Sequence, residues 1–417
     1  MSLKVRLIVM NFLQFAVWGA YLTSMGSYLV SINMASYIGW FYAIQGVVSI
    51  FMPAIMGIIA DRWVPAQKLL GFCHFAAAVF MAMAGYHGMS AGGAVDATIL
   101  FTSYSMSVAF YMPTLALANS VAYTALDRAG LDTVKHFPPI RIFGTIGFIC
   151  SMWAIDLLGL QTTYGQFFAC ALIGFVYSIY ALTLPKCPTS SDKGKSLVEA
   201  FGLRAFTLFR QKKMAIFFIF SMLLGVSLQI TNGFANPYIS SFGSLSEYAD
   251  TFGVQHANIL ISLSQISETL CILLIPFFLK RFGIKQVMLM AMLAWVLRFG
   301  LFATGNPGSG VWMFVLSMLV YGVAFDFFNI SGSLFVDRET DKNIRSSAQG
   351  LFMLMTNGLG ATIGTLAAQE VVDYFTTGSA TSPDEYRLAW WTFAGYALVV
   401  AILFALIFKY KHQPKGA

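Results

Sequence analysis

Two acidic residues lie inside long apolar stretches of this 417-residue sequence, where an ionised side chain is costly. Asp326 lies in the otherwise uncharged run from Val311 to Val336, and Glu268 lies well inside the apolar residues 255–279. A carboxylate at the centre of a membrane-spanning helix costs at least about 2.5–3.5 kcal/mol. A chain keeps such a group where it faces a polar cavity, a partner or a moving proton. Because a low dielectric favours the neutral carboxyl, we expect that either acid can bind a proton.

Polar side chains recur at helical spacing in the apolar segments that surround or follow these acids. The sets are Gln265 with Glu268; Asp326 with Asn329; Gln229 with Asn232; Arg141 with Thr145 and Phe148; and Gln349 with Thr356 and Asn357. Residues three or four positions apart lie on one face of a helix. In a membrane such faces point away from lipid, so together they predict a polar cavity for an uncharged solute that forms hydrogen bonds.

The residue types indicate which class of solute the cavity binds. Amides both donate and accept, which suits a nucleobase edge or sugar hydroxyls, and carboxylates accept bonds from vicinal hydroxyls. Phe148 and Phe325 offer flat faces for a base or a sugar ring. Other interpretations stay open, because intramembrane amides often only join neighbouring helices and the two acids could be ion-paired to hold the bundle. Arg298, inside the segment 284–304, is interpreted as structural or gate-forming, and His74 as a packing histidine.

Composition indicates a polytopic membrane protein. The chain is 58% hydrophobic and only 10% charged, whereas a soluble domain carries about 25% charged residues. Its net charge of +7 could suggest nucleic acid, but the basic residues lie in loops predicted on one side of the membrane, which argues against that partner. The five cysteines show no metal or disulfide spacing, so we expect no metal and no cofactor. Without a nucleophile–base pair, an intramembrane enzyme is also disfavoured.

Apolar segments of spanning length divide the chain into twelve predicted helices, because lipid-exposed backbone must form its hydrogen bonds internally. They are residues 6–30, 37–60, 68–87, 97–123, 139–158, 163–185, 214–240, 255–279, 284–304, 311–336, 346–373 and 388–409. All 25 lysines and arginines except Arg298 and Arg387 then lie on one side of the membrane or at its edge. The excess of positive charge predicts that this side, with both termini, is cytoplasmic.

The twelve segments are expected to form two halves. We predict an N-terminal six-helix half at 1–185, a cytoplasmic linker at 186–213 and a C-terminal six-helix half at 214–417. Each half contains a proline followed by a short basic loop, Pro53 before Asp61-Arg62 and Pro276 before Lys280-Arg281. This repetition is typical of a duplicated all-α transporter fold, with the substrate near the membrane midplane between the halves.

Longer strings carry a family resemblance over nearly the whole chain. The most specific are Phe-Pro-Pro-Ile-Arg-Ile-Phe-Gly-Thr at 137–145, Leu-Gln-Ile-Thr-Asn at 228–232, Ser-Gln-Ile-Ser-Glu at 264–268 and Ala-Phe-Asp-Phe-Phe-Asn-Ile-Ser-Gly-Ser at 324–333. With them the chain resembles the nucleoside–proton symporters of the major facilitator superfamily, the bacterial nucleoside and xanthosine permeases. The resemblance implies the twelve-helix major facilitator fold, alternating access, and proton-coupled nucleoside import across the bacterial inner membrane.

The resemblance also implies a set of site residues and partners. The substrate-binding positions are Arg141, Thr145, Phe148, Gln229, Asn232, Gln265, Glu268, Phe325 and Asp326. Asp326 and Glu268 are the expected proton-coupling residues, with the proton as coupling ion. The expected partners are a nucleoside and membrane lipid, and a monomer is expected. Two alternatives remain at this stage: a symporter of another neutral polar solute, such as a sugar or polyol, and a nutrient sensor that does not transport.

Overall fold

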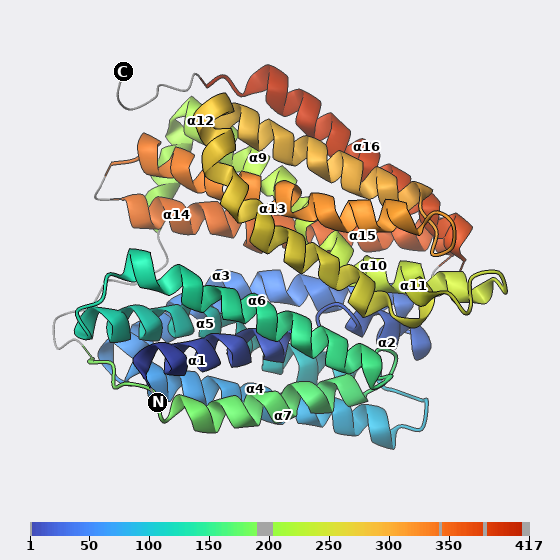
Figure 1. Ribbon diagram of the computed structural model, residues 1–417, viewed down its shortest axis with the longest axis horizontal. Coiled ribbons are helices and arrows are strands. Elements are labelled where there is room, and N and C mark those ends of the chain that lie inside the picture. The colour runs from blue at the N-terminus through green and yellow to red at the C-terminus, as the bar shows by residue number, and fades with distance from the viewer. Residues whose placement is uncertain (1, 190–202, 342–343, 378–381, 411–417) are drawn as a thin grey trace. The chain divides into compact units, whose positions relative to one another are not determined.

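The computed structural model describes residues 2–189, 203–341, 344–377 and 382–410, with the side chains at positions 61, 134, 345 and 346 also left aside. Helices make up the ordered elements of these ranges, and no strand occurs among the described residues (Figure 1). The predicted all-α architecture is therefore confirmed. Residues 190–202, which form much of the predicted linker, lie outside the described ranges. The described end of that linker contains a short 3₁₀ helix, η2 (Leu203–Arg210).

The chain folds into two compact units. Unit 1 comprises Met1–Met34 and Ile44–Phe201, and unit 2 comprises Ala35–Ala43 and Gly202–Ala417. The short segment Ala35–Ala43 thus groups with the second unit although it belongs to the first predicted half. Its contacts explain this grouping: the backbone N–H of Gly39 donates to Oε1 of Gln369 at 2.6 Å, and Nε2 of Gln369 donates to the carbonyl of Ala35 at 3.1 Å. A buried amide therefore satisfies backbone groups at a helix start.

Unit 1 is a bundle of helices, most of them long. Its helices are α1 (Leu3–Gly19), α2 (Met25–Ser31), most of α3 (Ile38–Arg62), α4 (Ala66–Ser90), α5 (Ala97–Arg128), α6 (Thr133–Leu157) and α7 (Gly165–Ala181). Helix α5 begins at a capping aspartate, since Asp96 accepts hydrogen bonds from the N–H groups of Thr98 and Ile99. Helix α6 lies against α1, and a side chain at Gly147 would meet the carbonyl oxygen of Phe12. Small residues thus allow the close helix approach that is common in membranes.

Unit 2 contains the remaining helices. They are η1 (Ala35–Tyr37), α9 (Lys212–Leu228), α10 (Ile230–Ser241), η3 (Phe242–Ser244), α11 (Phe252–Gln255), α12 (Ala257–Thr304), α13 (Val311–Glu339), α14 (Arg345–Met353), the π-helical turn η4 (Leu354–Gly360), α15 (Ala361–Thr376) and α16 (Pro383–Ile407). Helix α12 is interrupted at Gly283, whose φ of 78° is favourable only for glycine. The interruption divides it into two stretches, 257–282 and 284–304, which match two predicted segments.

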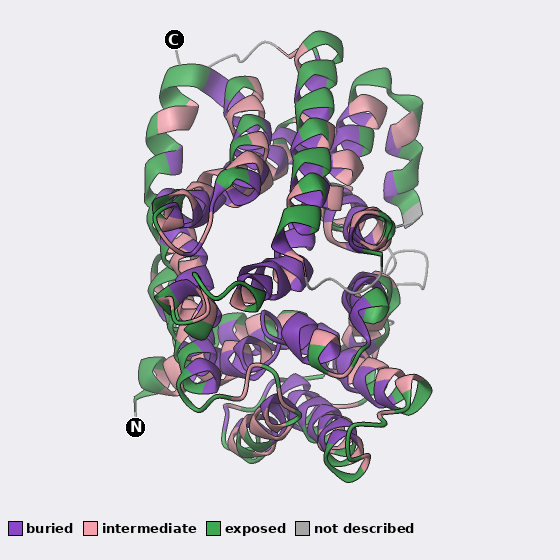
Figure 2. Cartoon of the chain, turned by 90° about the vertical axis from the view of Figure 1, so that its right-hand side faces the viewer, coloured by how far each residue is buried: buried purple, intermediate pink, exposed green. Residues whose placement is uncertain are grey.

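The predicted membrane segments agree with these helices. Within the described residues, 8 helices are long and apolar enough to cross a membrane, and one of them, α12, contains two predicted segments. The three predicted segments that remain coincide with the pair α1 and α2, with α5 and with α7. Exposed residues occur along many of the helices (Figure 2). Many large apolar side chains are among the exposed ones, including Leu273 at 74% and Ile179 at 70%. So extensive an apolar surface is that of a protein surrounded by lipid.

Candidate substrate and proton site

The crossing of α12 and α13 brings the two intramembrane acids together. Asp326 on α13 is buried, with 5% of its surface exposed, and Glu268 on α12 is half-buried and close enough to interact electrostatically with it. The crossing is tight, because a side chain at Gly322 would meet the backbone of Ser267 and the sulfur of Cys271. Hydrogen bonds also join the two helices there, since the Ser267 hydroxyl donates to the Leu319 carbonyl and accepts from the Gly322 N–H at 3.3 Å.

One oxygen of the Asp326 carboxyl, Oδ2, has no hydrogen-bond partner among the described residues. A buried carboxylate oxygen without a donor is costly. Its cost is removed when the group binds a proton, or when a ligand hydroxyl or N–H donates to it. The predicted interpretation that the two acids are simply ion-paired to hold the bundle finds no support at Asp326, which forms no ion pair within the described part of the chain. The arrangement suits proton or ligand binding.

The predicted amide pair lies at a break between helices. Gln229 is the junction residue between α9 and α10, and Nδ2 of Asn232 donates to its Oε1 at 2.8 Å. The hydrogen bond confirms that the two amides share a face. Both side chains are half-buried, and Nε2 of Gln229 has no partner among the described residues. Interrupted helices in transporters frequently carry substrate-binding groups, because the interruption exposes polar atoms at membrane depth.

Aromatic rings lie next to the acids. The rings of Tyr321 and Phe325 on α13 stack with centroids 5.5 Å apart and 15° between their planes. Phe325 is half-buried and directly precedes Asp326, as the sequence places it. Gln265 is also half-buried and lies on α12 one turn before Glu268. Unit 2 therefore contains six of the predicted site residues, on α9–α10, α12 and α13.

The other three predicted site residues lie on α6 of unit 1. The Arg141 guanidinium lies over the ring of Phe15, 3.9 Å from its centroid. Phe148 is buried, at 6% exposure, and its ring meets that of Trp18 edge to face at 6.4 Å. Thr145, between them on the helix, is half-buried. In this structure Arg141 and Phe148 thus contact α1.

Two further polar clusters were not part of the predicted site. In unit 1, Oε1 of Gln14 lies 3.1 Å from Nε2 of His74, and Nε2 of Gln14 donates to Oγ1 of Thr114 at 2.8 Å. His74 is fully buried, which agrees with its interpretation as a packing histidine, although its Nδ1 has no partner among the described residues. A polar residue in an apolar segment was the only sequence signal for this cluster.

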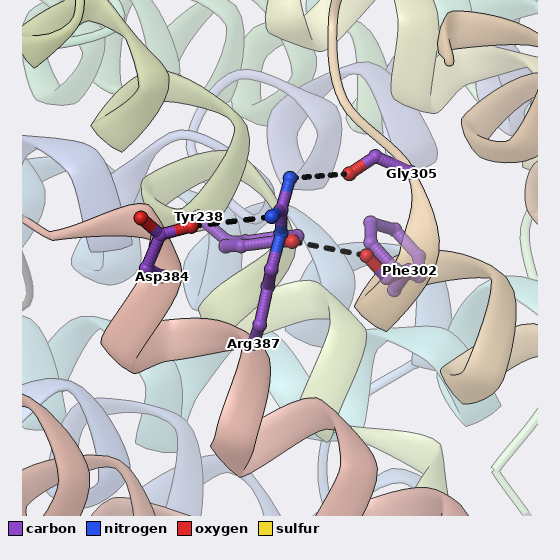
Figure 3. Close-up of polar contacts among 5 residues, drawn as sticks. All are labelled: Tyr238, Phe302, Gly305, Asp384 and Arg387. Atoms are coloured by element: carbon purple, nitrogen blue, oxygen red, sulfur yellow. Dashed lines mark hydrogen bonds and ion pairs between the residues drawn. The ribbon is translucent and has the colours of Figure 1, made fainter.

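The second cluster surrounds Arg387 at the start of α16 (Figure 3). Its guanidinium pairs with Asp384 at 3.1 Å and donates to the carbonyl of Gly305, which follows the last turn of α12, at 3.4 Å. Beside it the Tyr238 hydroxyl donates to the carbonyl of Phe302 at 3.0 Å. A cation and a hydroxyl thus satisfy carbonyl groups at the end of a helix, where no intrahelical donor is available. We interpret this cluster as structural.

Comparison with known proteins decides the family. The model of the family described as "Nucleoside H+ symporter" matches residues 1–413. The chain belongs to this family. It is 48% identical to the xanthosine permease of Escherichia coli K12, over 100% of this chain and 98% of that protein. It is 46% identical to the nucleoside permease NupG of the same organism, over 99% of this chain and 97% of that protein.

Solved structures agree with this membership. A crystal structure of the nucleoside transporter NupG superposes with a TM-score of 0.90 at 46% identity, covering 99% of this chain and 100% of the other. A crystal structure of a D-xylose–proton symporter matches with a TM-score of 0.70 at 14% identity, covering 97% of each chain, and at that identity it bears on the fold alone. This member of the nucleoside H+ symporter family therefore has the predicted major facilitator fold of a multi-pass membrane transporter.

Proposed function

We propose that this protein imports nucleosides together with protons across the bacterial inner membrane, as a monomer with both termini in the cytoplasm. The observation that carries the proposal is the buried Asp326 carboxyl, which interacts with Glu268 and has one oxygen without a partner in the part of the chain that the structure describes. Family membership supplies the solute class, because the relatives are a xanthosine permease and nucleoside permeases. The excess of basic residues in one set of loops supports the orientation.

The residues of unit 2 have the chemistry that a nucleoside requires. Gln229, Asn232 and Gln265 can donate to and accept from ribose hydroxyls and base edges. Phe325 offers a ring face on which a base stacks, and Phe148, Thr145 and Arg141 of α6 are proposed as further substrate-binding residues. The carboxyl oxygens of Asp326 accept hydrogen bonds from vicinal hydroxyls.

The coupling of nucleoside transport to proton binding follows from the proximity of the two acids. Two carboxylates that interact across a low-dielectric crossing repel, so the pair favours holding a proton over double ionisation. A protonated acid donates a hydrogen bond, whereas an ionised one only accepts. Proton occupancy and nucleoside affinity are therefore linked, and by reciprocity each ligand changes the affinity of the other. Alternating access of the halves then carries both across the membrane.

Uptake assays test the proposal. Cells that lack their own nucleoside transport, expressing this chain, should accumulate labelled uridine, and an uncoupler should abolish the accumulation. An excess of unlabelled nucleosides should compete, whereas sugars and polyols should not. Competition by a sugar with none by nucleosides would instead identify another solute. Binding of uridine without counterflow in liposomes would identify a sensor.

A further inference from the structure

Arg298 is a buried cation beside the candidate site. It lies on the second stretch of α12, after the interruption at Gly283, and only 2% of its surface is exposed. Within the described part of the chain it forms no ion pair. A guanidinium removed from water without a carboxylate partner is costly, so its contacts must provide a compensating advantage.

The hydrogen bonds of Arg298 connect three helical stretches. Its Nη1 donates to the carbonyl of Ser317 on α13 at 2.7 Å, and the Ser317 hydroxyl donates back to the Arg298 carbonyl at 2.9 Å. Both terminal nitrogens also lie 3.4 Å from the hydroxyl of Ser264, on the first stretch of α12. One planar side chain therefore holds the two stretches of α12 and helix α13 in register.

The same guanidinium lies over an aromatic ring. Its central carbon is 4.6 Å from the centroid of the Tyr321 ring, which in turn stacks on Phe325. A cation over a ring face is attracted by the ring quadrupole, and the attraction is strongest where water is excluded. The ring of Trp295 meets Tyr321 edge to face at 6.0 Å and holds it from another side. Arg298 thus contacts one ring of the Tyr321–Phe325 stack.

Two of the contacts of Arg298, those with Ser264 and Tyr321, lie one residue or one turn away from a candidate site residue. Ser264 directly precedes Gln265, and the Tyr321 ring contacts Phe325, which directly precedes Asp326. We infer that Arg298 is a positioning residue: it sets nucleoside affinity by fixing the aromatic stack of α13 relative to the polar face of α12, without touching the substrate. This inference rests on the proposed function. Lysine cannot replace arginine here, because its single nitrogen cannot donate from two separate positions of a planar group that lies flat over a ring.

The full-length Arg298→Lys variant tests the inference. Calorimetry should show uridine binding weakened roughly tenfold, about 1.4 kcal/mol. In proteoliposomes KM should rise by a similar factor with little change in maximal rate, and the thermal midpoint should stay close to that of wild type. A folded variant with wild-type affinity would overturn the positioning role. Arg281→Lys is the matched control: Arg281 is exposed on the same helix, 5.8 Å from the ring of Phe282, and its replacement should leave affinity unchanged.

A second variant keeps the inference testable if lysine prevents folding. Tyr321→Leu removes the ring on which the guanidinium lies, so it should also weaken uridine binding. Wild-type affinity in a folded Tyr321→Leu protein would contradict the inference. Where Arg298→Lys also folds, adding it to Tyr321→Leu should weaken binding by less than Arg298→Lys does alone, because the two side chains act through one contact. Fully additive effects would contradict the inference.

The two proposals fail in different ways. If the wild-type protein binds uridine and both variants match it, only the positioning role is rejected. If the wild-type protein binds no nucleoside, the proposed function is rejected, and a crystal structure of the Arg298→Lys variant becomes the test of positioning. Displaced rings at Tyr321 and Phe325 would then support the role of Arg298, and rings that stay in place would reject it.

Discussion

His74 in unit 1 and Asp326 in unit 2 are both buried titratable side chains on membrane helices, but their surroundings differ. His74 faces the amide of Gln14, which is itself bonded to Thr114, so neutral groups form a chain of hydrogen bonds. Asp326 instead lies beside a second carboxyl and has an oxygen with no donor among the described residues. Hydrogen bonds among neutral groups stabilise a bundle, whereas a buried carboxyl beside a second carboxyl has the capacity to bind a proton or a ligand donor. The comparison separates a hydrogen-bonded polar cluster from the candidate proton site.

The largest effect on uridine transport is expected when a residue of the acid pair, Asp326 or Glu268, is replaced. Asp326→Asn keeps the size of the side chain but removes the exchangeable proton, so it should abolish the pH-driven accumulation of uridine in membrane vesicles. Exchange of uridine without net accumulation should persist, because the amide still forms hydrogen bonds. Accumulation at the wild-type level in this variant would remove Asp326 from coupling.

Two companion variants sharpen this result. Asp156→Asn is the matched control, since Asp156 on α6 is buried but accepts a hydrogen bond from Gln161 at 3.0 Å, and accumulation should be unchanged. Glu268→Gln distinguishes the members of the pair. If Glu268→Gln loses accumulation while Asp326→Asn retains it, the proton is carried by Glu268 and Asp326 binds the solute.

A smaller effect, on uridine affinity, is expected when a residue of the amide pair Gln229 and Asn232 is replaced. Gln229→Ala removes one hydrogen-bonding partner of the solute and the acceptor of Asn232, so calorimetry should show uridine binding weakened by about 1 kcal/mol, or roughly fivefold. Gln255→Ala is the control, because that exposed amide donates to the Ala249 carbonyl at 2.8 Å, away from the candidate site residues. An unchanged affinity in Gln229→Ala would exclude Gln229 from the site.

The smallest effect on transport is expected at the neutral network. His74→Leu removes the partner of Oε1 of Gln14, so it should lower the free energy of unfolding by about 1–3 kcal/mol, the cost of an unsatisfied buried group. The pH dependence of uridine uptake should match that of wild type. A shifted pH profile in this variant would show that His74 takes part in coupling, and the distinction between the two regions would be lost.

Much of the candidate site was predictable because its signals are local. The helical period places Gln229 beside Asn232 and Gln265 above Glu268, and the structure confirms the first pair through a hydrogen bond. The cost of a charge in an apolar run singles out Asp326 without knowledge of any contact. The same cost singles out Arg298, but the sequence contains no sign of which helices it connects.

The amino-acid sequence by itself determined the helical segments, the polar face of each and the two acids, because periodicity and hydrophobicity act over one or two turns. Contacts between distant segments required the folded chain. Only there does Gln369 satisfy the start of α3, Phe148 pack against Trp18, and Arg298 reach both Ser264 and Tyr321. The physical reason is that a side chain's partner depends on which helices cross and at what depth, and no local pattern encodes that crossing.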